Sequence, residues 1–214
     1  MIDVDENDVA GVILAGGLAR RMGGGDKGMK SLAGESLLAR IVKRIKPQVG
    51  PLVLNANGDS QRFKAFSLPV AADVIGDNPG PLAGILTGLE WVAAHAPDVK
   101  WMVSVPCDAP FLPMDLVERL RSEATKQSMP LACAMSHGRT HPVVGLWSVA
   151  LRDDLRQAIV QEEMRKVDRW TERHGICHVS FDDIVIGNES FDPFYNANKP
   201  DDLVRVESLL DRQK

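Results

Sequence analysis

Short apolar runs alternate with segments of helical periodicity in the first part of the chain. The apolar runs are partly β-branched and predict buried strands over residues 9–15, 51–55, 69–74 and 101–105. Apolar positions three and four residues apart predict helices over residues 36–46, 81–95 and 114–126. Strands that alternate with helices are typical of α/β proteins built on a doubly wound, mostly parallel sheet.

The rest of the chain is less regular but continues this pattern. Strands are predicted over residues 130–135, 143–147 and 176–181, and residues 136–142 are expected to connect the first two. Helices are predicted over residues 149–160, 165–174 and 201–212. No linker or repeat marks a domain boundary, so residues 1–214 are expected to form a single domain around one sheet.

Composition and charge narrow the class of protein. The chain has 214 residues, 44% of them hydrophobic and 25% charged, which is ordinary for a globular protein with a substantial core. A net charge of −4 gives no support for general nucleic-acid binding, and no apolar run approaches a membrane span. Residues 1–8 are acidic and lack the regions of a signal peptide. The scattered cysteines Cys107, Cys133 and Cys177 fit a reducing compartment, so we expect a cytoplasmic protein.

A glycine-rich basic loop follows the first predicted strand. Residues 16–28 contain six glycines together with Arg20, Arg21 and Lys27. Glycine lets backbone N–H groups approach a phosphate, and arginine and lysine donate charge-assisted hydrogen bonds to it. The loop therefore predicts a site for a nucleoside triphosphate. The alternative is a flexible basic loop that binds nothing.

Two named phosphate-binding loops do not fit this stretch. A Walker A loop needs Gly before its Lys and Ser or Thr after it, whereas Lys27 stands between Asp26 and Gly28. The spacing of Gly23, Gly25 and Gly28 matches G-x-G-x-x-G. These glycines lie well past the strand end, where the dinucleotide-binding fingerprint should begin at once. We therefore treat that match as accidental.

Polar residues also follow the other predicted strands. Asn55, Asp73 and Asp108 stand at or just past strand ends, and open α/β sheets bind ligands at the carboxyl ends of their strands. We expect these side chains along one edge of the sheet, together with residues 15–17. A strand-end carboxylate such as Asp108 can hold Mg²⁺ with the phosphates of a substrate. Asn and Asp are also ordinary turn residues, which is the alternative for all three positions.

Three further segments contain turn-forming or polar residues that could serve a site. Residues 80–84 form a glycine-flanked, Pro-started helix entry, which is at least a turn and a cap. His137, Arg139 and His141 cluster before a predicted strand and can meet a phosphate, although a lone histidine is more often structural. Asn198 stands ahead of the last predicted helix, where a capping role is the alternative to a functional one.

Taken together, these motifs resemble those of the molybdenum cofactor guanylyltransferases. Residues 14–23 read L-A-G-G-x-x-x-R-M-G, and residues 26–28 add D-K-G. Residues 55–57 read N-A-N, residues 80–84 read G-P-L-A-G, and residues 106–108 read P-C-D. The resemblance covers most of the chain. It is dense over residues 12–28 and 55–110 and thin from there to Phe194.

The resemblance implies a Rossmann-like fold of the nucleotide-diphospho-sugar transferase type. It implies a nucleotide-binding half over about residues 9–127 and an acceptor-binding half over about 128–214. The implied reaction transfers GMP from GTP to the terminal phosphate of molybdopterin, with Mg²⁺ as cofactor and pyrophosphate as the leaving group. GTP and molybdopterin are the implied small-molecule partners, and molybdoenzyme apoproteins or their chaperones would receive the product.

The resemblance also carries roles to individual residues. GTP binding falls to Leu14, Ala15, Gly16, Gly17, Arg20, Lys27, Asn55, Asp73, Gly80, Gly84 and Asp108. Catalysis falls to Lys27, Arg21 and Asp108, and Asp108 is the implied magnesium ligand. Acceptor binding falls to His137, Arg139, His141, Asn196 and Asn198.

The chain departs from the family pattern in two places. Residues 196–203 read N-A-N-K-P-D-D-L where the family has N-x-N-T-P-E-D-L. Related transferases carry Asp at one or both of these Asn positions as a second metal ligand, a role that Asn196 and Asn198 fill less well. The segment between Asp73 and Gly80 is shorter than the usual version.

Three other functions remain open from the sequence. The chain could be a cytidylyltransferase for the same cofactor or a sugar-phosphate nucleotidyltransferase, since the selection of guanine rests on resemblance alone. It could also be a nucleotide-binding adaptor that delivers molybdopterin to apoenzymes without catalysis. Pyrophosphate release with different nucleoside triphosphates separates these alternatives.

Overall fold

A seven-stranded sheet forms the centre of the molecule. The computed structural model describes residues 8–16, 26–76, 80–186, 188–196 and 207. The strand order is β5-β4-β1-β6-β8-β7-β9. The strands are β1 (Val9–Leu14), β4 (Leu52–Asn55), β5 (Val70–Ala71), β6 (Trp101–Pro106), β7 (Leu131–Ser136), β8 (Arg139–Ser148) and β9 (Cys177–Ser180). All pairings in this sheet are parallel except those of β8, which runs antiparallel to β6 and β7. The predicted α/β class with a mostly parallel sheet is confirmed.

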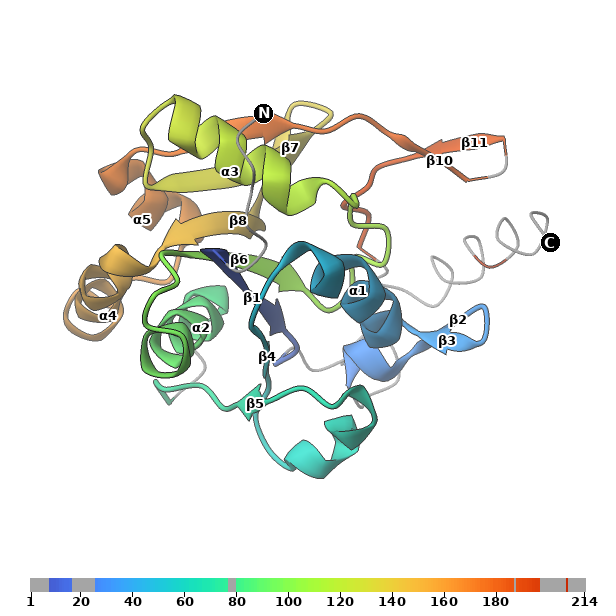
Figure 1. The fold of residues 1–214 in the computed structure, drawn as a ribbon, viewed down its shortest axis with the longest axis horizontal. Helices are drawn as coiled ribbons and strands as arrows, with labels where there is room; N and C mark the ends of the chain where they lie inside the picture. The colour runs from blue at the N-terminus through green and yellow to red at the C-terminus, as the bar shows by residue number, and fades with distance from the viewer. Residues whose placement is uncertain (1–7, 17–25, 77–79, 187, 197–206, 208–214) are drawn as a thin grey trace.

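Helices cover both faces of the sheet (Figure 1). They are α1 (Leu37–Ile45), α2 (Pro81–His95), α3 (Leu116–Lys126), α4 (Arg152–Gln161) and α5 (Val167–His174). α1 and α3 bury their apolar residues against one face, and α2, α4 and α5 bury theirs against the other. Among the described helices, none is both long and apolar enough to cross a membrane.

Local chemistry explains where the first two helices begin. The Ser36 hydroxyl accepts a hydrogen bond from the Ala39 N–H at 3.2 Å, so Ser36 caps α1. Gly80, the N-cap of α2, has a φ of 81°, a conformation that favours glycine, and Pro81 opens the helix. The chain therefore turns sharply into α2 at the edge of the sheet.

Two glycines let α2 approach the sheet closely. A Cβ atom at Gly84 would lie 2.4 Å from Asn55 Oδ1 and 2.8 Å from Leu14 Cδ2. A Cβ atom at Gly88 would lie 2.9 Å from the Val12 side chain. Because a side chain has no room at either position, the glycines bring the N-terminus of α2 beside the ends of β1 and β4.

Most predicted elements are confirmed with small changes at their ends, and two differ. The strand predicted over residues 69–74 has only two paired residues. The connection predicted over residues 136–142 is wrong, because β8 already begins at Arg139. His137 and Gly138 have φ values of 48° and 71°, which allow a two-residue hairpin turn. The helix predicted over residues 201–212 lies almost wholly outside the described residues.

Several short elements were not predicted at all. They are the 3₁₀-helices η3 (Lys27–Met29), η4 (Lys46–Gln48) and η5 (Ser60–Phe66) and the strands β2 (Ser31–Leu32), β3 (Glu35–Ser36), β10 (Ile184–Ile186) and β11 (Glu189–Phe191). A further 3₁₀-helix, η6 (Val149–Leu151), forms the start of the helix predicted over residues 149–160. Two- and three-residue strands are too short to show an alternating pattern. η5 is the longest of them; the Asp59 carboxylate caps its start and Phe63 anchors it in the core.

Candidate active site

A cleft of about 690 Å³ opens at the carboxyl ends of β1, β4 and β6. Its lining comprises Leu14, Ala15, Gly16, Asp26, Lys27, Asn55, Asn57, Arg62, Asp73, Gly80, Pro81, Gly84, Pro106, Cys107, Asp108 and Val143. The volume falls in the range of sites for small organic ligands. All the residues predicted to bind GTP that the structure describes line this cleft.

Lys27 and Asp108 face each other in the cleft as an ion pair. Asp108 follows β6, whose end is tied to β1 by a hydrogen bond from the Cys107 N–H to the Leu14 carbonyl at 3.1 Å. Gly28 packs against Cys107, the residue before Asp108, since a Cβ atom on Gly28 would lie 3.3 Å from Cys107 Cβ. Both charged side chains are largely buried, at 15% and 13% exposure. The sheet thus holds a cation and an anion side by side where a ligand would enter.

Asn55, Asn57 and Asp73 form a second polar group in the cleft. Asn55 Nδ2 donates to Asp73 Oδ1 at 2.8 Å, and Asn57 Nδ2 donates to Asp73 Oδ2 at 2.7 Å. The Asp73 N–H in turn donates to Asn57 Oδ1 at 2.8 Å. Amide donors therefore hold both oxygens of this carboxylate, and within the described part of the chain it forms no ion pair.

Arg62 joins the two polar groups from η5. Its Nη2 donates to the Asn57 carbonyl, and its Nε lies 2.6 Å from Asp26 Oδ2 in an ion pair that is not aligned as a hydrogen bond. The guanidinium also stacks on Phe63, 4.5 Å from the ring centroid. Asp26 directly precedes Lys27, so Arg62 connects the loop after β4 with the basic loop after β1.

The site contains lining residues that sequence reasoning did not assign to it, namely Asp26, Asn57, Arg62, Pro81, Pro106 and Val143. For Asn57 a signal was present, because the N-A-N spacing returns to the same side of the chain as Asn55. For Arg62 the sequence held no signal, since its place depends on the unpredicted helix η5.

The predicted acceptor residues that the structure describes lie outside the cleft lining. His137 Nε2 lies 2.6 Å from Asp183 Oδ1 at the tip of the β7–β8 hairpin. His141 Nε2 forms a hydrogen bond with the Ser136 hydroxyl at 2.7 Å. The pKa of His141 is lowered below its usual value, and burial is the main cause. Arg139 and Asn196 are exposed. Val143, further along β8, is the residue of this region that reaches the cleft.

Some predicted site residues fall on parts of the chain that are not described. These are Gly17, Arg20, Arg21 and Asn198. Their predicted roles remain predictions.

Asp108 has the chemistry to hold a magnesium ion. Within the described ranges, no three His, Cys, Asp or Glu side chains gather in a way that could bind a metal by themselves. Mg²⁺ commonly takes one or two carboxylates and completes its ligands with substrate phosphates and water. One carboxylate at a cleft beside the Lys27 ammonium group fits that pattern. The neighbouring Cys107 is no alternative nucleophile, because burial raises the pKa of its thiol to about 12.

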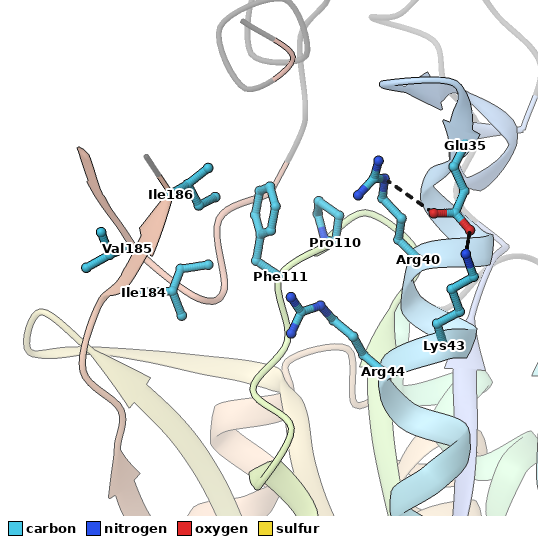
Figure 2. A pocket seen from close by; sticks show the side chains of 9 residues that line it. All are labelled: Glu35, Arg40, Lys43, Arg44, Pro110, Phe111, Ile184, Val185 and Ile186. Carbon is cyan, nitrogen blue, oxygen red and sulfur yellow. Dashed lines mark ion pairs between the residues drawn. The ribbon is translucent and has the colours of Figure 1, made fainter. Parts of the chain in front are cut away.

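Residues around a second hollow support the loop that carries Asp108. This hollow, of about 280 Å³, lies between α1 and β10 (Figure 2). Lys43 and Arg40 pair with the Glu35 carboxylate at 2.5 and 3.9 Å. Arg44 Nη1 donates to the Leu112 carbonyl at 2.9 Å. Through this hydrogen bond, α1 holds the segment that follows Asp108 in the chain.

The chain is similar in sequence to known nucleotidyltransferases. The model of the MobA-like NTP transferase domain matches residues 11–176. A molybdenum cofactor guanylyltransferase of Rhodopseudomonas palustris (strain BisB5) is 52% identical over 198 residues, which are 92% of each chain. The protein of the same name from Bradyrhizobium sp. (strain ORS 278) is 53% identical over 201 residues, 94% of this chain and 92% of that one.

Among solved structures, the fold is similar to that of molybdopterin-guanine dinucleotide biosynthesis protein A from Archaeoglobus fulgidus. The TM-score is 0.69 at 24% identity, over 95% of this chain and 99% of that one. This likeness supports the predicted fold type. With a family model that covers most of the chain and relatives about half identical to it, the chain belongs to the MobA-like NTP transferases, in the family of molybdenum cofactor guanylyltransferases.

Proposed function

We propose that this protein transfers GMP from GTP to the terminal phosphate of molybdopterin and releases pyrophosphate. One observation carries the proposal: a single cleft holds Lys27 and Asp108 at one place and the Asn55–Asp73 pair at another. The first pair suits a triphosphate with its metal, and the second suits the N–H and O–H donors of a nucleoside. The identity to proteins named for this activity supports the choice of substrates.

The proposed step is an in-line displacement at the α-phosphorus of GTP. A terminal phosphate oxygen of molybdopterin forms a new P–O bond, and the bond between the α-phosphorus and the bridging oxygen breaks. The electron pair leaves with pyrophosphate. Because the nucleophile is already an anion, no proton has to be removed, and the chain needs no general base. Catalysis then rests on positioning and charge neutralisation.

The side chains divide this work between them. Lys27 binds phosphate oxygens and stabilises the charge that develops on pyrophosphate. Arg20 and Arg21, predicted from the sequence, add further cations. Asp108 would hold Mg²⁺, and the bound ion would neutralise charge on the phosphates. In the absence of nucleotide, Lys27 and Asp108 neutralise each other.

A nucleotide-selectivity assay tests the proposal. Pyrophosphate release is measured with molybdopterin, Mg²⁺ and GTP, CTP or ATP, with a chelator in place of Mg²⁺ as control. We expect release with GTP and Mg²⁺ only. Release with CTP in place of GTP would indicate a cytidylyltransferase. Nucleotide binding without any release would leave the adaptor function.

Two further points belong to the same proposal. Molybdoenzyme apoproteins or their chaperones receive the product, as the family resemblance implies. A cytoplasmic location is supported by the three cysteines, which are all buried and free of disulfides.

A further inference from the structure

Asn57 bonds twice to one neighbour in the cleft. Its Nδ2 donates to the Asp73 carboxylate at 2.7 Å, and its Oδ1 accepts the backbone N–H of Asp73 at 2.8 Å. The two contacts act on the main chain and on the side chain of the same residue. Asn57 therefore fixes both the position of Asp73 and the rotation of its carboxylate.

The other carboxylate oxygen is held from the sheet. Asn55, 3% exposed at the end of β4, donates to Asp73 Oδ1 at 2.8 Å and to the Ala71 carbonyl at 3.2 Å. Each carboxylate oxygen can accept more than one hydrogen bond, so both still have capacity for a ligand. Among the described residues, the partners of this carboxylate are neutral amides, so its negative charge is retained. Such a charge repels phosphates and attracts N–H and O–H donors, which the base and the ribose of a nucleotide supply.

From this arrangement we propose that Asn57 is a positioning residue for nucleotide recognition, which acts by holding the Asp73 carboxylate in the orientation that receives the nucleoside. The proposal rests on the proposed function, since it takes a nucleoside triphosphate as the ligand of the cleft. The roles that the family resemblance implies include Asn55 and Asp73 but not Asn57.

The main chain of Asn57 has a separate contact that makes a clean test possible. Its carbonyl accepts a hydrogen bond from Arg62, which pairs with Asp26 beside Lys27. A side-chain substitution keeps this carbonyl, so the connection to the phosphate end of the cleft is retained. Loss of the side chain should affect the nucleoside end alone.

The first experiment is a double-mutant cycle of Asn57→Ala and Asp73→Ala. We expect Asn57→Ala to raise the Kd and KM for GTP about tenfold, equal to about 1.4 kcal/mol, and to leave kcat within about twofold. In the Asp73→Ala background, Asn57→Ala should have little further effect, because its partner is gone. Gln61→Ala, an exposed change on the neighbouring η5, is the matched control and should behave as wild type.

A second variant keeps the experiment decisive if Asn57→Ala unfolds. Asn57→Asp keeps the oxygen that accepts the Asp73 N–H but replaces the donor by a second carboxylate. Two adjacent carboxylates can share a proton at low pH, which restores a hydrogen bond between them. The ratio of variant KM to wild-type KM should therefore fall as the pH is lowered from about 8 to about 5.5. If Asn57 only supported the fold, the ratio of the two KM values would not fall with pH.

Two results would overturn the proposal. One is an Asn57→Ala effect of equal size with and without Asp73, which would show that Asn57 acts independently. The other is a fall in kcat with an unchanged KM. If CTP proves to be the substrate, the guanine preference of the proposed function fails, and the same cycle run with CTP still decides the role of Asn57.

Discussion

The ion pair of Lys27 and Asp108 joins residues 81 positions apart in the chain. The lysine arrives on a short 3₁₀-helix, and the aspartate follows a buried strand. Both side chains are largely buried. Either charge without a partner would lower the stability of the fold, because a buried charge loses its hydration. In the proposed reaction, a triphosphate replaces Asp108 as the partner of Lys27.

Lys27→Ala should lower kcat for pyrophosphate release by about 10²–10³-fold, the usual cost of one preorganised charge that stabilises a leaving group. The melting temperature should fall somewhat as well, since the largely buried Asp108 carboxylate loses this partner, so turnover is measured at a temperature where the variant is folded. Lys64→Ala, an exposed substitution on η5, serves as control. Normal turnover in a well-folded Lys27→Ala variant would remove this residue from the mechanism.

His141 belongs to a hydrogen-bond chain near the turn of the β7–β8 hairpin. The Ser136 hydroxyl donates to Asp192 Oδ1 at 2.8 Å, so it has no second hydrogen for His141 Nε2, which lies 2.7 Å from the hydroxyl oxygen. The imidazole must therefore carry its hydrogen on Nε2 and donate it to Ser136. Protonation at acid pH adds a proton to Nδ1.

His141 should make the protein less stable as the pH falls below about 6.5, the usual pKa of histidine. Burial chiefly lowers its pKa in the folded state, so in this range the unfolded chain binds more protons than the native one. Stability therefore rises with pH through the window and is complete above it. Urea unfolding between about pH 5 and 7 should show a flatter dependence for His141→Gln than for wild type. An equal change with the exposed His178→Gln would contradict the assignment.

α2 depends on glycine for its place beside the strands. Its N-terminal turn borders the cleft, and Gly84 allows the helix backbone to lie against Leu14 and Asn55. Helix propensity alone would favour alanine at this position by about 1 kcal/mol. Close packing and propensity therefore make opposite predictions for the same substitution.

Gly84→Ala should destabilise the protein by about 1–3 kcal/mol, because the new methyl group overlaps Asn55 and pushes the helix or the amide aside. The KM for GTP should rise as well, since Asn55 holds Asp73. Chemical denaturation and steady-state kinetics measure the two effects. Ala94→Gly, at an exposed position of the same helix, measures how much helix propensity alone changes the free energy of unfolding. A more stable Gly84→Ala variant would show that the packing can relax.

Long periodic elements were predictable from the sequence, and short ones were not. Residues 81–95 carry apolar side chains at helical spacing after a Pro-started turn, and α2 has these limits. η5 lacks such a pattern, since a capping Asp59 and a buried Phe63 hold it in place. Arg62 sits on this element, so the sequence could not place it in the cleft.

Strand β8 connects the two halves of the chain. It lies antiparallel between β6 of the first half and β7 of the second. Trp147 on β8 donates to the Ser104 hydroxyl of β6 at 2.8 Å, and that hydroxyl donates to the Val143 carbonyl at 2.7 Å. Ser104 and Trp147 are both buried, so these hydrogen bonds would be lost if the halves separated.

The protein should unfold in one cooperative transition. The sheet and the two apolar layers each contain residues of both halves, so neither half can keep its core without the other. Tryptophan fluorescence and far-UV circular dichroism, followed through urea unfolding, should give the same midpoint. Two separated transitions would show that the halves fold as independent units.

Local information was enough for the fold class, and together with the family resemblance it selected the main candidate residues of the site. The period of apolar residues distinguishes strands from helices. Glycine, proline and charge make Lys27, Asp108 and residues 80–84 candidates in the sequence, and the family motifs favour them over ordinary turn residues. Strand ends in parallel order must meet at one edge, so the gathering of Asn55 and Asp108 followed from the topology.

Contacts between distant segments were decided only by the packed molecule. The direction of β8, the placement of His137 outside the cleft lining, and the contacts of Asn57 and Arg62 in the cleft depend on how loops close and which register the strands adopt. Loop conformation and strand register are set by packing and hydrogen bonds across the whole core. The pattern of residues along the chain does not show these long-range contacts.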